Sequence, residues 1–165
     1  MMETDNESYW QSPLTGAYLL WRFVRGFCSQ DDKGVNVILA YPALALAISD
    51  EFSSDVMQSS SVADFAYSFH DSAGRRVRSL AGLQERIANL KSWVLKSIEF
   101  ACVTRLIELD PVTARLKLVL QEENPESANL ANCYKKKEGL VAEKVGALFA
   151  REDASKIGYY LGVQF

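Results

Sequence analysis

The most constraining feature of this sequence is the stretch from Ser12 to Phe27, where apolar side chains occupy almost every side of a predicted helix. Ser12 suits an N-cap and Pro13 suits the first helical position, so the start of the helix is well marked. One stripe at helical spacing consists of Leu14, Ala17, Tyr18, Trp21 and Val24. A second set covers much of the remaining helix surface and consists of Leu19, Leu20, Phe23 and Phe27. A helix that is apolar on all sides must be covered, either inside a core or at an interface, and the sequence leaves both open.

Length and composition predict a single domain. The chain has 165 residues, of which 48% are hydrophobic, enough to bury a core. We expect residues 1–11 to form a flexible, polar arm and residues 12–165 to form one mostly helical domain with a docking helix and tail at its C-terminal end. The acidic start of the chain is unlike a secretory signal, which favours a cytoplasmic location. The apolar run from 35 to 48 is shorter than the roughly 20 residues of a membrane span.

The cysteines and the net charge argue against several classes of protein. The three cysteines are widely spaced and form no C-x-x-C pair, which is typical of reduced thiols and predicts neither a metal nor a cofactor. A formal net charge of −3 argues against coating of nucleic acid through overall charge. Any contact with DNA therefore has to be local.

Hydrophobic periodicity predicts a mainly α fold with a small β-hairpin. We expect a strand over 35–41 and a short helix over 43–48, with helix throughout as the alternative, then a connector from 51 to 61. Ser60 or Ser61 is expected to cap a helix that reaches Phe69. One long helix or two consecutive helices should occupy 76–105.

The rest of the chain completes a winged-helix-like outline. Alternating residues on both sides of an Asp110–Thr113 turn predict a hairpin over 106–120. A last helix is expected over 131–151. The tail from Ile157 to Phe165 is unusually apolar for a chain end, which predicts that it docks onto other structure.

Signatures of catalysis are missing. The sequence lacks the common nucleotide, zinc and serine-hydrolase motifs, and His70 is its single histidine. We therefore expect a protein that is not an enzyme, although a small enzyme that uses His70 remains an alternative.

Two sets of residues are candidates for binding. Large apolar side chains of the arm, the first helix and the tail are the candidate partner-binding residues, namely Trp10, Leu14, Tyr18, Trp21, Phe23, Phe27, Tyr159, Tyr160 and Phe165. Cations before and within the hairpin are the weaker candidates for nucleic-acid contact, namely Arg75, Arg76, Arg78, Arg115 and Lys117. The alternative for the cations is a solvated helix face, because Glu85, Glu99 and Glu108 interrupt the positive field.

The ordered segments resemble the middle components of prokaryotic ABC-three component systems. The similarity covers about Ser12 to Val163 and is carried by a Pro-x-x-Gly-Ala-x-Leu-Leu-x-x-Phe-x-x-Gly-aromatic helix that begins at Pro13. It continues through the apolar stretch that holds Pro42 and the Leu-x-Leu hairpin. It ends in a Lys-x-Gly-x-x-Phe-Ala-Arg helix that begins at Lys144.

The resemblance implies a role within a complex. It implies a non-catalytic adaptor that bridges an SMC-like ABC ATPase to an effector subunit, often a nuclease, in anti-phage or anti-plasmid defence of the Lamassu-like neighbourhood. DNA would then be contacted through the complex. From the residues alone, a winged-helix DNA-binding regulator remains the alternative function.

Overall fold

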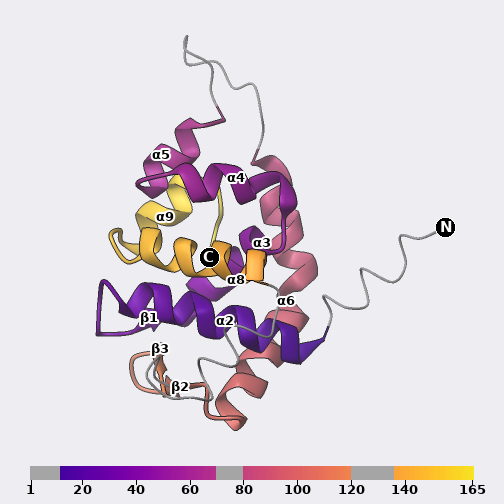
Figure 1. The fold of residues 1–165 in the computed structure, drawn as a ribbon, viewed down its shortest axis with the longest axis vertical. Coiled ribbons are helices and arrows are strands. Elements are labelled where there is room, and N and C mark those ends of the chain that lie inside the picture. Colours follow the sequence, from indigo (N-terminus) through magenta and orange to yellow (C-terminus); the bar gives the residue numbers. More distant parts are fainter. Residues whose placement is uncertain (1–11, 70–79, 120–135) are drawn as a thin grey trace, which may run out of the picture.

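The computed structural model describes residues 12–69, 80–119 and 136–165, and these parts are mainly helical with one small sheet (Figure 1). The first half contains α2 (Pro13–Cys28), β1 (Val35–Asn36), η1 (Val37–Leu39), α3 (Ala40–Ala47), α4 (Asp50–Gln58) and α5 (Val62–Tyr67). The second half contains α6 (Ala81–Val103), β2 (Ile107–Asp110), β3 (Arg115–Leu118), α8 (Lys136–Phe149) and α9 (Ala154–Leu161). The fold class predicted from the sequence is therefore confirmed.

Helix α2 lies at the centre of the molecule. It packs against α8, α6, α3 and β3, and nearly all of its residues are buried. In Figure 1, α4, α8 and α2 follow one another down the molecule, α6 runs along one side and the sheet lies below α2. Of the two readings of this apolar helix, the structure supports the core.

The segment after α2 differs from the sequence prediction. The strand ends at Asn36, because the Asn36 side chain accepts a hydrogen bond from the Ile38 N–H at 3.1 Å and starts a 3₁₀ turn. Helix α3 begins at Ala40, so Pro42 lies in its first turn, where a missing N–H leaves no helical bond unmade. The predicted connector contains α4. At α5 the predicted cap is confirmed, because Ser61 Oγ accepts the Asp64 N–H at 3.0 Å.

The hairpin forms where the sequence predicts it. The Asp110 carboxylate accepts hydrogen bonds from the N–H groups of Val112 and Thr113, which hold the pKa of Asp110 below its usual value. Strand β3 pairs antiparallel with both neighbours, giving the order β1-β3-β2. Because β1 follows the first helix and the hairpin follows α6, this topology is compatible with a winged helix.

The C-terminal segments pack onto the rest of the chain. Helix α8 is described from Lys136 to Phe149, and residues 131–135 of the predicted last helix lie outside the described parts. The apolar tail contains a further helix, α9, which ends at Leu161 and is followed by Gly162 with a left-handed φ of 67°. Ile157, Leu161 and Val163 are buried, and α9 packs against α5.

Among the described residues, no single helix is both long enough and apolar enough to span a membrane. One pair of helical segments, Val37–Ala47 and Asp50–Gln58, meets the length and composition test only when combined, and it is bent by 109°.

Candidate partner-binding surface

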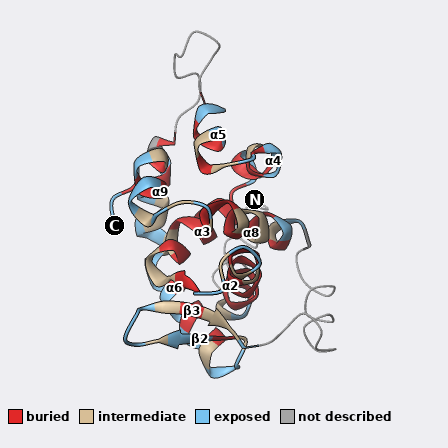
Figure 2. Cartoon of the chain, turned by 90° about the vertical axis from the view of Figure 1, so that its left-hand side faces the viewer, coloured by how far each residue is buried: buried red, intermediate tan, exposed pale blue. Residues whose placement is uncertain are grey.

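Four of the predicted partner-binding residues lie in the core. Tyr18, Trp21, Phe23 and Phe27 are at most 5% exposed, and α2 is mostly buried in Figure 2. Their predicted position on an interface is therefore corrected: α8, α6, α3 and β3 of the same chain already cover them. A contact between these side chains and another protein would require the core to open.

The other predicted partner-binding residues are spread over the surface. Leu14 is 39% exposed at the start of α2, whereas Tyr159 at 83% and Phe165 at 54% are exposed at the end of the chain. Tyr160 is partly buried and its ring lies 5.7 Å from that of Tyr159. In Figures 1 and 2 the end helix α9 lies beside α5, while α2 lies beside the sheet, so the two groups form no common surface. Trp10 lies outside the described residues.

Small residues allow the helices to enclose α2. A Cβ atom at Gly26 would lie 2.0 Å from the carbonyl oxygen of Glu143, and one at Gly146 would lie 2.1 Å from that of Phe23. Both obstacles are backbone atoms of the facing helix. At Gly16 the obstacle is the Ser97 side chain of α6. The glycines of the α2 and α8 motifs are thus points of close helix packing.

An ion pair joins α2 to α8 at the same crossing. Arg22 is 5% exposed, and its Nε lies 2.6 Å from Glu143 Oε2, in an orientation that forms no hydrogen bond between the two atoms. Arg25 Nε lies 3.9 Å from the same oxygen. Burial is the main cause of the raised pKa of Tyr18, whose hydroxyl accepts a hydrogen bond from Arg22 at 3.4 Å. Arg22 and Tyr18 lie inside the helix crossing, whereas Arg25 and Glu143 also line an open hollow of about 530 Å³.

The predicted nucleic-acid contacts of the hairpin are balanced by acids. In the β2–β3 register, Lys117 lies directly opposite Glu108 and Arg115 lies directly opposite Asp110. Arg115 also donates a hydrogen bond of 2.6 Å to the Gly34 carbonyl oxygen. Opposite charges at such positions interact favourably and reduce the net positive field. Arg75, Arg76, Arg78 and His70 lie outside the described residues.

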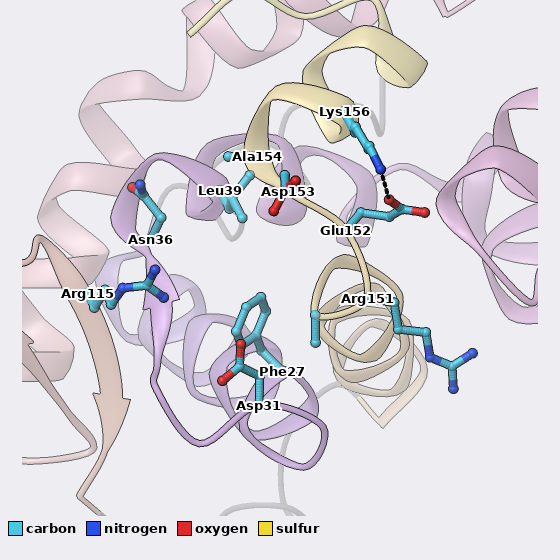
Figure 3. A pocket seen from close by; sticks show the side chains of 11 residues that line it. Phe27, Asp31, Asn36, Leu39, Arg115, Arg151, Glu152, Asp153, Ala154 and Lys156 are labelled. Atoms are coloured by element: carbon cyan, nitrogen blue, oxygen red, sulfur yellow. Dashed lines mark ion pairs between the residues drawn. The ribbon is translucent and has the colours of Figure 1, made fainter.

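A polar cavity of about 280 Å³ lies between the end of α2, β1, η1 and the α8–α9 connection. Three cations and three anions line it, so the formal charges of its lining balance. Arg115 bonds Gly34, while Arg151 extends away from the cavity in Figure 3 and donates to the Ser60 carbonyl oxygen at 3.1 Å. Lys156 pairs with Glu152 at 3.8 Å (Figure 3). The cavity therefore has the character of a satisfied surface hollow.

An open concavity with a largely apolar lining lies between α6 and β2, and we call it the α6–β2 groove. Its volume is about 780 Å³, and its lining residues are Leu95, Ile98, Glu99, Cys102, Val103, Arg105, Ile107, Glu108, Leu109 and Val119. Leu95 is 58% exposed, Val103 is 77% exposed and Leu109 is 42% exposed. Side chains of this size gathered at one concave surface are typical of a contact site for another protein.

The groove was missed by reasoning from the sequence, although a signal was present. Leu95 and Val103 lie two helical turns apart, outside the buried stripe of α6 that contains Val94, Ile98 and Ala101. Two apolar residues that repeat on the outer face of a helix indicate a second contact surface.

A helix-ending turn sets the angle between the two walls of the groove. The Leu106 N–H donates to the Ala101 carbonyl oxygen at 2.9 Å, and the Arg105 N–H donates to that of Cys102 at 3.1 Å. This is the pairing of a Schellman motif, in which Arg105 takes the left-handed position with φ of 59°. Strand β2 therefore leaves α6 in a fixed direction.

The described residues offer no arrangement for metal chemistry. Within 12–69, 80–119 and 136–165, no group of three or more His, Cys, Asp or Glu side chains could hold a metal ion.

The fold and the groove together define a small, mainly helical protein with a winged-helix-compatible topology and an exposed apolar surface. The chain belongs to the ABC-three component system Middle Component 3 family, whose model matches residues 2–165. No curated protein and no solved structure matches the chain. The resemblance to a middle component is thereby confirmed for nearly the whole sequence.

Proposed function

We propose that this chain is a non-catalytic adaptor that acts in the cytoplasm and joins an SMC-like ABC ATPase to an effector subunit. The proposed effector is a nuclease, and the proposed setting is Lamassu-like defence against phages or plasmids. Family membership supports a role as one component of a larger system. In this complex, DNA would be contacted through the assembled subunits.

The observation that carries this proposal is the exposed α6–β2 groove. Leu95, Val103 and Leu109 expose apolar area that the chain leaves uncovered within its described residues. Covering such area in a complex removes it from water and stabilises the bound state by about 25 cal/mol per Å² before the costs of association. Leu95 and Val103, the most exposed large apolar side chains among the described residues of α6, are thus available for a partner.

A winged-helix DNA-binding regulator is the second candidate, because the strand order β1-β3-β2 is compatible with that fold. The acids opposite Arg115 and Lys117 weigh against a positively charged wing. A regulator would have to bind duplex DNA as an isolated chain. Of the five candidate contacts, Arg75, Arg76 and Arg78 would then remain to bind the DNA. An adaptor requires binding to proteins instead.

Co-expression with the other two components of the same system tests the adaptor. We expect a tagged chain to retain both components through purification, and we expect Leu95→Asp to reduce the amount retained at least tenfold, because a carboxylate in the groove would have to be desolvated. Met57→Asp is the matched control, since Met57 is 46% exposed on α4, away from the groove. Failure of the wild-type chain to retain either component would overturn the proposed function.

A further inference from the structure

Strand β2 has an open edge. The sheet order places β2 at one side of the sheet, and among the described residues no other strand pairs with it there. The Val119 N–H donates to the Leu106 carbonyl oxygen, so the alternating antiparallel pattern directs the amides of Glu108 and Asp110 toward β3. The backbone groups of Ile107 and Leu109 therefore face the open edge.

The open edge faces the α6–β2 groove. Ile107 and Leu109 of β2 both line the groove, together with Cys102 from the last turns of α6. The backbone groups that point away from β3 therefore lie at the wall of the groove, where the carbonyl oxygens and N–H groups of an extended peptide could pair with them.

We propose that β2 accepts an extended segment of another component of the ABC-three component system as an added strand that lies in the α6–β2 groove. This inference rests on the proposed adaptor function and deepens it. Addition of a strand uses backbone hydrogen bonds for affinity and alternate side chains for specificity. Both elements are present, as open backbone groups at Ile107 and Leu109 and as an apolar wall on α6.

The side chains of β2 specify the chemistry of the added strand. Ile107 and Leu109 lie on one face of β2, and Glu108 lies on the other, because side chains alternate along a strand. The added strand should carry apolar residues on the face of Leu109, where they also reach Leu95 and Val103. On the opposite face, a Lys or Arg beside Glu108 would continue the alternation of charge that Lys117 begins on the β3 side. Glu99, which lies between Leu95 and Val103 on the α6 wall, offers a second acid to a basic segment.

The same charges disfavour a second copy of this chain as the occupant. Two β2 strands paired edge to edge would bring the acids of Ile107–Asp110 close to the same acids of the other copy. Like charges directly opposite one another destabilise a strand pair, whereas a basic partner strand is stabilised there.

Leu109→Pro tests the open edge directly. Proline removes the Leu109 N–H, which makes no bond to β3, and proline is tolerated on edge strands. Leu109→Ala removes the side chain but keeps the N–H, so it is the matched control. The binding partner in this measurement is the component that the wild-type chain retains through purification. For that partner, we expect the dissociation constant of Leu109→Pro to be at least tenfold higher than that of Leu109→Ala.

Glu108→Lys tests the charge preference without touching the backbone. We expect at least a tenfold weaker complex, whereas Glu85→Lys, an equal change at an exposed position near the start of α6, should bind like the wild type. The unfolding midpoint of each variant establishes that it is folded before binding is measured.

Two results would overturn the inference. The first is wild-type affinity for both Leu109→Pro and Glu108→Lys. That result leaves the adaptor function standing, whereas a wild-type chain that binds neither component removes both proposals. The second is a dimer in light scattering that Glu108→Lys changes in stability, which assigns the edge to a second copy.

Discussion

Replacing Gly26 or Gly146 with alanine is expected to lower the free energy of unfolding by roughly 4 kcal/mol or more, beyond the ~1–3 kcal/mol of ordinary overpacking. The added Cβ would lie 2.0 Å from the Glu143 oxygen in the first case and 2.1 Å from the Phe23 oxygen in the second. These obstacles belong to helix backbones, so α2 and α8 must separate as units. Separation would also open the cluster around Arg22 and Glu143.

Chemical denaturation followed by circular dichroism measures this effect, and Gly82→Ala is its control. Gly82 lies in the first turn of α6 and a Cβ there would meet nothing within 4 Å. Alanine at that position should be neutral or stabilise the helix by up to about 1 kcal/mol, because alanine has the higher helix propensity. Equal unfolding midpoints for Gly26→Ala and the wild type would show that the helices cross elsewhere.

Trp21→Ala is expected to lower the free energy of unfolding by about 3–5 kcal/mol. Trp21 is fully buried, its ring lies 6.4 Å from that of Tyr18, and the Arg25 guanidinium lies over it at 5.5 Å. Truncation would leave a cavity beneath Arg25 that rigid helices cannot fill. Any loss of a partner in this variant would follow from loss of the fold.

Leu95→Ala is the comparison for Trp21→Ala in the same denaturation experiment, because it changes a surface residue instead of a core residue. Leu95 is 58% exposed, so its truncation should change the free energy of unfolding by less than about 0.5 kcal/mol. If the Trp21→Ala protein stayed folded but no longer bound its partner, α2 would be part of the partner-binding surface after all.

Elements with a local chemical signal were predictable from the sequence. Pro13 marks the start of α2, Ser61 caps α5, and the Asp110 turn closes the hairpin, and each of these depends on residues close together in the chain. The topology compatible with a winged helix followed from their order. By contrast, the two-residue length of β1 depends on one side-chain bond at Asn36.

The contact surface was less predictable, because it depends on long-range packing. An all-apolar helix such as α2 gives no local indication of whether its own chain or another protein covers it. In this chain α6 and α8 cover α2, and Gly146 of α8 allows the backbones of α2 and α8 to approach each other closely. Once α2 is covered, the apolar side chains that stay exposed include Leu95, Val103 and Leu109 of the groove.

Hydrogen exchange of the chain alone and bound to the other components tests the central claim most directly, because exchange reports the protection of each backbone amide. We expect binding to slow exchange at Ile107 and Leu109 on the open edge of β2. Exchange in α2, which is already buried, should stay unchanged. New protection within α2 together with unchanged exchange in β2 would contradict the claim that this subunit binds through the α6–β2 groove.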